Sequence, residues 1–235
     1  MAIPKIIHQI WSSKKNLFPE AFGELADTWK SFHPDWDYIF WDDQKMEDFM
    51  QTYYPHYVEP FSRFAYDVQR WDVIRYLILY QMGGFYADMD TECLENIEPL
   101  LNADCCFGTD TKDNIIYADL VKEAYLNNTY IASAPQHPFL DAVIHRVFHS
   151  EAMFTPHANK LLRVLQTSGA LMLSEEYSRY CAKEQIRVIP AEEVAPFSLK
   201  EVHAILAGAE NEEWNARLQK AYAVHYFIGS WNYYK

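Results

Sequence analysis

The sequence has few cysteines, no long apolar run and little positive charge. Its four cysteines form no Cys-x-x-Cys pair and no zinc-ligand spacing, which argues against a disulfide framework and a structural zinc site. No apolar run approaches the roughly 18 residues of a membrane-spanning helix, and no secretory segment opens the chain. The formal net charge of −13 argues against nucleic-acid binding through a basic surface. We therefore expect a cytoplasmic protein with reduced thiols and no nucleic-acid partner.

Half of the 235 residues are hydrophobic and 16% are aromatic, so the chain can bury a sizeable core. The length fits one domain over residues 1–235. Predicted strands and helices alternate, which is typical of an α/β fold of Rossmann type, with a mostly parallel sheet and helices on both faces. We expect strands at 3–11, 36–41, 85–90, 106–108, 130–134, 186–189 and 224–227, and helices at 20–32, 45–53, 60–82, 139–148, 159–165 and 210–222.

The stretch from residue 60 to residue 94 is the most informative. Apolar residues recur at three-and-four spacing from Phe64 to Met82, which predicts a helix with one buried face. Gly83-Gly84 ends that helix and would let the chain reverse tightly and approach a ligand. The period then changes to two, so a strand would present alternate side chains on one face: Tyr86, Asp88 and Asp90.

Two carboxylates at the end of one strand repel each other unless a cation lies between them. Asp88 and Asp90 therefore predict a site for magnesium or manganese, which favour hard oxygen ligands. The spacing alone is weak evidence, because the aspartates of this chain would produce about one Asp-x-Asp by chance. Asp35 and Asp37 are a second copy without a glycine turn, and we expect these two acids to be solvated at the surface.

Asp72 and Arg75 share one face of the predicted helix, and two interpretations are open. The two side chains could form an ion pair across one helical turn. Alternatively, Asp72 accepts hydrogen bonds from sugar hydroxyls while Arg75 donates to a phosphate or hydroxyl near the cation. The residues alone do not decide between them.

Three separated motifs resemble one known family. They are IPKIIHQIW at residues 3–11, WDxxRY followed by LYxxGGxYxDxD at residues 71–90, and HYFIGSW at residues 225–231. Together they resemble glycosyltransferase family 32, which includes fungal initiating mannosyltransferases and bacterial capsule and polysaccharide transferases. The glucosylating domains of large clostridial toxins carry a similar core. The resemblance implies a single GT-A-like α/β domain.

The implied activity is metal-dependent transfer of a hexose, with retention of configuration, from a UDP- or GDP-linked donor to a glycan hydroxyl in polysaccharide or capsule synthesis. The acceptor would be a glycan or a lipid-linked oligosaccharide, which leaves peripheral membrane contact open. The implied catalytic residues are Asp72, Arg75, Asp88 and Asp90. The implied donor-binding residues are His8, Gln9, Trp11, Asp72, Arg75, Tyr86, Asp88, Ser230 and Trp231. Manganese, or else magnesium, would be held by Asp88, Asp90 and His225, with Ser230 as the alternative third ligand.

Other interpretations remain open. Asp88-Met89-Asp90-Thr91 also matches the Asp-x-Asp-x-Thr motif of haloacid-dehalogenase-like phosphatases, although their later Gly-Asp-x-x-x-Asp cluster is missing. A transferase-like domain that only binds a glycan or nucleotide is the third reading, and the presence of Asp88, Asp90 and Arg75 argues against it. His8 lies within an apolar strand, where a histidine is more often packed in the core than bound to a ligand.

Overall fold

The structure is a computed structural model that describes residues 2–14 and 17–228. The strands are β1 (Ile6–Ile10), β2 (Asp37–Trp41), β3 (Gly84–Ala87), β4 (Thr91–Cys93), β5 (Cys105–Gly108), β6 (Tyr130–Ser133), β7 (Ile186–Ile189) and β8 (Ala223–His225). Six of them form a central sheet in the order β2-β1-β3-β6-β5-β7, and β4 pairs with β8 in a separate antiparallel ribbon. Within the central sheet of the described chain, β6 alone runs against its neighbours.

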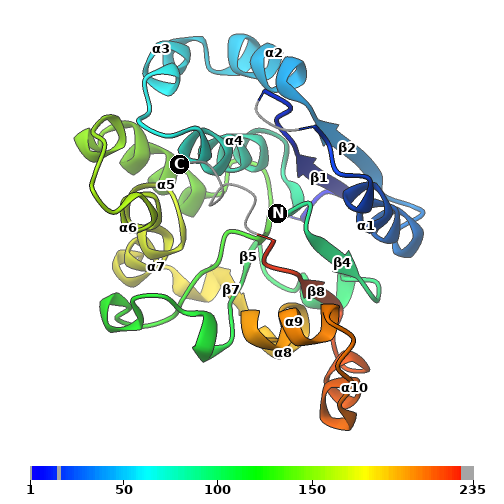
Figure 1. Cartoon of the computed structure of the whole chain (residues 1–235). Coiled ribbons are helices and arrows are strands. Elements are labelled where there is room, and N and C mark those ends of the chain that lie inside the picture. The colour runs from blue at the N-terminus through cyan, green and yellow to red at the C-terminus, as the bar shows by residue number, and fades with distance from the viewer. Residues whose placement is uncertain (1, 15–16, 229–235) are drawn as a thin grey trace.

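Helices cover both faces of this sheet (Figure 1). They are α1 (Glu20–Phe32), α2 (Asp43–Tyr53), α3 (Val58–Ser62), α4 (Asp67–Met82), α5 (Pro138–Phe148), α6 (Lys160–Thr167), α7 (Ala170–Arg179), α8 (Ala191–Val194), α9 (Leu199–Leu206) and α10 (Glu212–Leu218). Side chains of α2, α4, α5 and α7 pack on one face, and those of α1 and α8 pack on the other. The predicted mostly parallel α/β fold is confirmed. No helix in the described part of the chain is long and apolar enough to cross a membrane.

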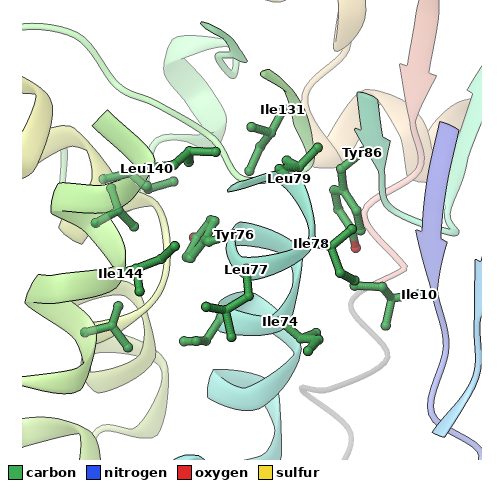
Figure 2. Close-up of a cluster of buried hydrophobic side chains, with 14 of the residues drawn as sticks. Ile10, Ile74, Tyr76, Leu77, Ile78, Leu79, Tyr86, Ile131, Leu140 and Ile144 are labelled. Carbon is green, nitrogen blue, oxygen red and sulfur yellow. The ribbon is translucent and has the colours of Figure 1, made fainter. Parts of the chain in front are cut away.

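The helix α4 is buried on all sides, so the prediction of one buried face is wrong. Every residue from Asp72 to Leu79, two full turns, is buried. Figure 2 shows why: α4 lies between Leu140 and Ile144 of α5 on one side and the sheet side chains, including Tyr86, on the other. A helix enclosed by both the sheet and other helices has no solvent face. Its polar residues are therefore buried as well.

The predicted helix at 60–82 is two helices, α3 and α4, with a break at residues 63–66. After this break α4 begins at Asp67, and the side chain of Gln69 accepts a hydrogen bond from the backbone N–H of Tyr66, 3.0 Å away. That bond satisfies a donor at the start of the helix. The elements β4, α7, α8 and α9 are not among the predicted ones. β4 is three residues long, too short to show a period.

The glycine pair lies at the start of β3, at the opposite end of that strand from Asp88. Gly83 and Gly84 have φ angles of 68° and 105°, which glycine tolerates. A Cβ on Gly83 would lie 2.7 Å from carbons of Pro4 and Pro135, and one on Gly84 would lie 2.7 Å from the Ile6 carbonyl oxygen. The prediction that the pair approaches a ligand is wrong, because protein atoms fill that space.

Candidate functional site

A cavity of about 390 Å³ opens at the edge of the sheet where β1, β3 and β5 end. In α/β sheets, ligands bind outside the carboxyl ends of the strands. The polar part of its wall includes Ser12 after β1, Asp72 and Arg75 on α4, Asp88 and Asp90 after β3, Asp110, Asp113 and Asn114 after β5, Asn127, Asn128 and Thr129 before β6, and His225 on β8. Aromatic and apolar residues, among them Trp11, Phe22, Trp71 and Leu165, line the rest. The cavity can therefore bury an apolar ring and still bind hydroxyls and charges.

The chain turns at Asp88 instead of continuing as a strand. The predicted strand at 85–90 ends at Ala87, and Met89 and Asp90 form a turn before β4. The Asp88 carbonyl oxygen accepts hydrogen bonds from the Gln9 side chain at 3.2 Å and from the Thr91 hydroxyl at 2.6 Å. These bonds hold the turn in a fixed position. The position of Asp90 is therefore set by this turn and not by the alternation of side chains along a strand.

Asp88, Asp90 and His225 form a cluster suited to a cation. One potential ligand atom from each lies within 4.8 Å of the other two. The two hydrogen bonds to the Asp88 carboxylate, from Arg75 at 3.0 Å and from the Tyr86 hydroxyl at 2.6 Å, both use Oδ1. Among the described residues this leaves Oδ2 for another partner. Two carboxylates and one imidazole are ligands that manganese and magnesium accept in proteins. The predicted metal-binding residues are thus brought together, although 135 positions separate Asp90 from His225 in the sequence.

The chain after β8 closes against Asp90. The backbone N–H of Tyr226 donates to the Asp90 carbonyl oxygen, and that of Ile228 donates to Asp90 Oδ2, both at 2.9 Å. His225 Nε2 lies 3.5 Å from Asp90 Oδ1. Burial alone would raise the pKa of Asp90, but His225 and the Ile228 N–H outweigh burial and lower it. Burial alone would lower the pKa of His225, but Asp90 outweighs burial and raises this pKa. The pair therefore favours the charged forms.

Asp72 and Arg75 form a buried ion pair, with Arg75 Nη2 3.3 Å from Asp72 Oδ1. Asp72 also accepts hydrogen bonds from Asn128 Nδ2 at 2.8 Å and from the Ser168 hydroxyl at 2.7 Å. Burial raises the pKa of Asp72 to about 6, against the opposing effects of Arg75 and Ser168. The ion-pair interpretation is confirmed. Both residues also line the cavity, so the structure is compatible with contact to a sugar as well.

The Arg75 guanidinium has a protein partner at each of its nitrogens. Nε donates to the Trp71 carbonyl oxygen at 3.2 Å, and Nη1 donates to Asp88 and to the Asn128 carbonyl oxygen at 3.0 and 2.7 Å. The guanidinium also lies over the Tyr86 ring, 4.5 Å from its centroid. Burial would lower the pKa of Arg75, but Asp88 outweighs it and raises it. Arg75 therefore links the α4 carboxylate to the carboxylate after β3.

Of the residues predicted on β1, His8 and Gln9 do not line the cavity. His8 is fully buried, its Nε2 bonds the Gly83 carbonyl oxygen at 2.9 Å, and its Nδ1 accepts from the Trp41 indole at 3.1 Å. Burial lowers the pKa of His8 to about 4, so the ring is neutral. Its side chain is the packed core histidine of the alternative interpretation. The Gln9 side chain donates a hydrogen bond to the Asp88 carbonyl oxygen, so it supports the turn at Asp88 and does not line the cavity.

Trp11 does line the cavity, and its indole Nε1 is buried without a hydrogen-bond partner among the described residues. Asp35 and Asp37 are exposed, as predicted. Ser230 and Trp231 lie outside the described residues. The proposed alternative ligand Ser230 is therefore not placed.

Sequence reasoning missed four polar residues that belong to the site or support it: Asp110, Asn127, Asn128 and Ser168. Three of them lie in short polar stretches just outside β5 and β6. A polar residue directly after or before a buried strand is the signal that could have found them, since both ends meet at one edge of the sheet.

Residues 19–107 match the family described as "Glycosyltransferase sugar-binding region containing DXD motif". The chain is 32% identical over 195 residues to inositol phosphoceramide mannosyltransferase 1 of Schizosaccharomyces pombe, covering 80% of this chain and 56% of that protein. It is 33% identical over 103 residues to the initiation-specific alpha-1,6-mannosyltransferase of Saccharomyces cerevisiae, covering 41% of this chain and 21% of that protein. The chain spans about half the length of the inositol phosphoceramide mannosyltransferases it matches.

Among solved structures, the PaToxG glycosyltransferase superposes with a TM-score of 0.58 at 14% identity, over 94% of this chain and 89% of that one. At this identity the likeness concerns the fold alone, which is GT-A-like as the motifs predict. The matched residues include Asp88-Met89-Asp90, the turn at the centre of the cation cluster, which has the Asp-x-Asp spacing that the family description names. The chain therefore carries a glycosyltransferase sugar-binding region with a DXD motif on a GT-A-like fold, and it is homologous to the inositol phosphoceramide and initiation-specific mannosyltransferases.

Proposed function

We propose that this protein transfers a hexose, mannose in the first instance, from a nucleotide diphosphate sugar to a hydroxyl of an acceptor. The observation that carries the proposal is the convergence of Asp88, Asp90 and His225 at one wall of a cavity. The names of the relatives, which are mannosyltransferases, support the choice of mannose. An acidic protein that binds an anionic donor needs a local positive charge, and a cation at this cluster would supply it.

Manganese, or else magnesium, would be held by Asp88, Asp90 and His225. The chain fits such an ion on three counts: the ligand atoms lie within 4.8 Å of one another, Asp88 Oδ2 faces no partner among the described residues, and the donor set suits a hard cation. When bound, the ion would neutralise negative charge that develops on the departing nucleoside diphosphate. His225 is the favoured third ligand.

The side chains around the cluster would bind and orient the donor. Arg75 and Tyr86 hold Asp88 Oδ1, so that carboxylate keeps one orientation. The aromatic walls at Trp11 and Trp71 would exclude water from the sugar and present a face for its ring. The Asp72 carboxylate would accept hydrogen bonds from sugar hydroxyls at its remaining lone pairs.

Retention of configuration is part of the proposal. Asp72 accepts hydrogen bonds from protein donors at both of its oxygens, and Asp88 and Asp90 are assigned to the cation, so none of the three stands out as the nucleophile of a covalent intermediate. We therefore favour attack from the face that the diphosphate leaves. The acceptor oxygen bonds to the sugar carbon, the bond from that carbon to the phosphate oxygen breaks, and the acceptor proton passes to the departing phosphate oxygen.

The acceptor would be a polyol, either a glycan or the inositol head of a phosphoinositol lipid. The names of several relatives mention inositol phosphoceramide, which favours the second. Exposed apolar side chains at the cavity, Ile116 and Leu199, would suit the lipid of such an acceptor.

Release of free nucleotide diphosphate from GDP-mannose, UDP-glucose and UDP-galactose in the presence of manganese tests this function without an acceptor. We expect slow hydrolysis of GDP-mannose that stops when EDTA removes the metal. No hydrolysis of any donor, together with phosphate release from p-nitrophenyl phosphate, would favour the phosphatase interpretation. The similarity to glycosyltransferases in sequence and in fold argues against that interpretation.

A further inference from the structure

Asp110 is a buried carboxylate with one oxygen unused. It follows β5 in the cavity wall and is 8% exposed. Its Oδ2 accepts a hydrogen bond from Asn127 Nδ2. Its Oδ1 is also buried and has no hydrogen-bond partner among the described residues. A buried polar atom without a partner costs free energy, so Oδ1 is expected to gain a partner when the site is assembled.

The neighbouring amide cannot turn to supply that partner. Asn127 Oδ1 accepts hydrogen bonds from the backbone N–H and the hydroxyl of Thr129, at 2.9 and 3.0 Å. These bonds fix the amide oxygen toward Thr129 and the amide nitrogen toward Asp110. The backbone N–H of Asn127 also donates to the Gly108 carbonyl oxygen at 2.8 Å, which ties it to the end of β5. Asp110 is therefore held with Oδ1 directed away from Asn127.

His225 has the complementary unused atom. Its Nε2 lies toward Asp90, whereas its Nδ1 is buried without a partner among the described residues. Tyr130 connects the two regions, because its ring packs edge-on against His225, with 6.5 Å between ring centroids, and also lies against Gly108. Asp110 and His225 both line the same cavity, so the two unused atoms belong to one site.

We infer that Asp110 is a positioning residue that orients His225 toward the cation. The Nδ1–H of His225 donates to Asp110 Oδ1, and the Nε2 lone pair is then directed at the ion between Asp88 and Asp90. A carboxylate that holds the far nitrogen of a metal-binding histidine fixes both its tautomer and its ring orientation. Asp110 lies outside the group of ligand atoms itself. The inference rests on the proposed cation site.

The substitution Asp110→Asn tests whether Asp110 orients His225. Because the Asn127 amide is fixed, the new amide must direct its oxygen to Asn127 and its NH₂ group toward His225, where donor would face donor. With manganese titrated in the presence of GDP and followed by electron paramagnetic resonance, we expect affinity about 10- to 100-fold weaker than in the wild type. Asp119→Asn is the matched control: it removes the same charge from an exposed position between β5 and β6 that does not line the cavity, and solvent screening should limit its effect to about threefold.

A second measurement uses the wild-type protein, in case Asp110→Asn does not fold. Nitrogen-15 chemical shifts of His225 with magnesium and GDP should show the proton on Nδ1. The inference is overturned if the proton is on Nε2, if Asp110→Asn binds manganese like the wild type, or if Asp110→Asn and Asp119→Asn weaken binding equally. Wild-type protein that binds no manganese would instead remove the proposed cation site, so the two failures are distinguishable.

Discussion

At the scale of single residues, the site depends on charges that burial makes costly. Asp72 and Arg75 are both buried, and the charge of each depends on opposite charges beside it: Arg75 for Asp72, and both Asp88 and Asp72 for Arg75. Even with Arg75, Asn128 and Ser168 as partners, burial raises the pKa of Asp72 to about 6. The charged form of this carboxylate is thus less stable in the folded protein than in the unfolded chain, where its pKa is near 4.

Asp72 should therefore make stability fall as pH rises. Between about pH 4 and about pH 6 the folded state keeps a proton that the unfolded state has lost, so the free energy of unfolding decreases across this window, by up to about 3 kcal/mol. In Asp72→Asn this contribution is absent. Urea unfolding at pH 4 and pH 7 should show the variant gaining stability relative to the wild type as pH rises. Asp119→Asn, at an exposed site, is the control. A variant-to-wild-type difference that stays constant with pH contradicts the assignment.

At the scale of elements, the periodic segments could be predicted and the turns could not. Every predicted strand overlaps an observed one, because alternating or continuous apolar residues mark strands that the core buries. The burial of α4 on all sides could not be predicted, since Asp72 and Arg75 look like solvent-facing charges until their partners on other segments are known. Asp110 was missed for a related reason: its place just after β5 was a signal, but a short polar loop does not show in sequence that one of its carboxylates is buried.

The junction of α4 and β3 should tolerate no side chain at its second glycine. A Cβ on Gly84 would lie 2.7 Å from the Ile6 carbonyl oxygen and 2.9 Å from His8 Nε2, in addition to the strain of a φ of 105°. We expect Gly84→Ala to lower the free energy of unfolding by at least about 3 kcal/mol. Gly208 has a φ of 86°, and a Cβ there would meet no atom within 4 Å. Backbone strain alone should therefore make Gly208→Ala lower the free energy of unfolding by about 1 kcal/mol. Equal costs in denaturant titrations of the two variants would contradict the steric account.

At the scale of the whole molecule, the site is assembled from segments far apart in the sequence. The pairing of β4 with β8 brings His225 opposite Thr91, directly after the Asp88–Asp90 turn. The amino-terminal strand contributes Trp11, and α4 contributes the buried ion pair. The resemblance to one family covered all three motifs, and this resemblance predicted that the segments carrying them meet at one site. The terminal motif was predicted to extend to Ser230 and Trp231, which lie outside the described residues.

The central claim is that a cation held by Asp88, Asp90 and His225 enables cleavage of a nucleotide sugar. The rate of manganese-dependent GDP-mannose hydrolysis, compared between the wild type and Asp90→Ala, tests it most directly. Circular dichroism should confirm that the variant is folded. We predict a loss of at least about 100-fold in Asp90→Ala at saturating donor, the magnitude typical of removing one electrostatic element of transition-state stabilisation. A folded Asp90→Ala variant that hydrolyses GDP-mannose at the wild-type rate, with the same dependence on manganese, would contradict the account.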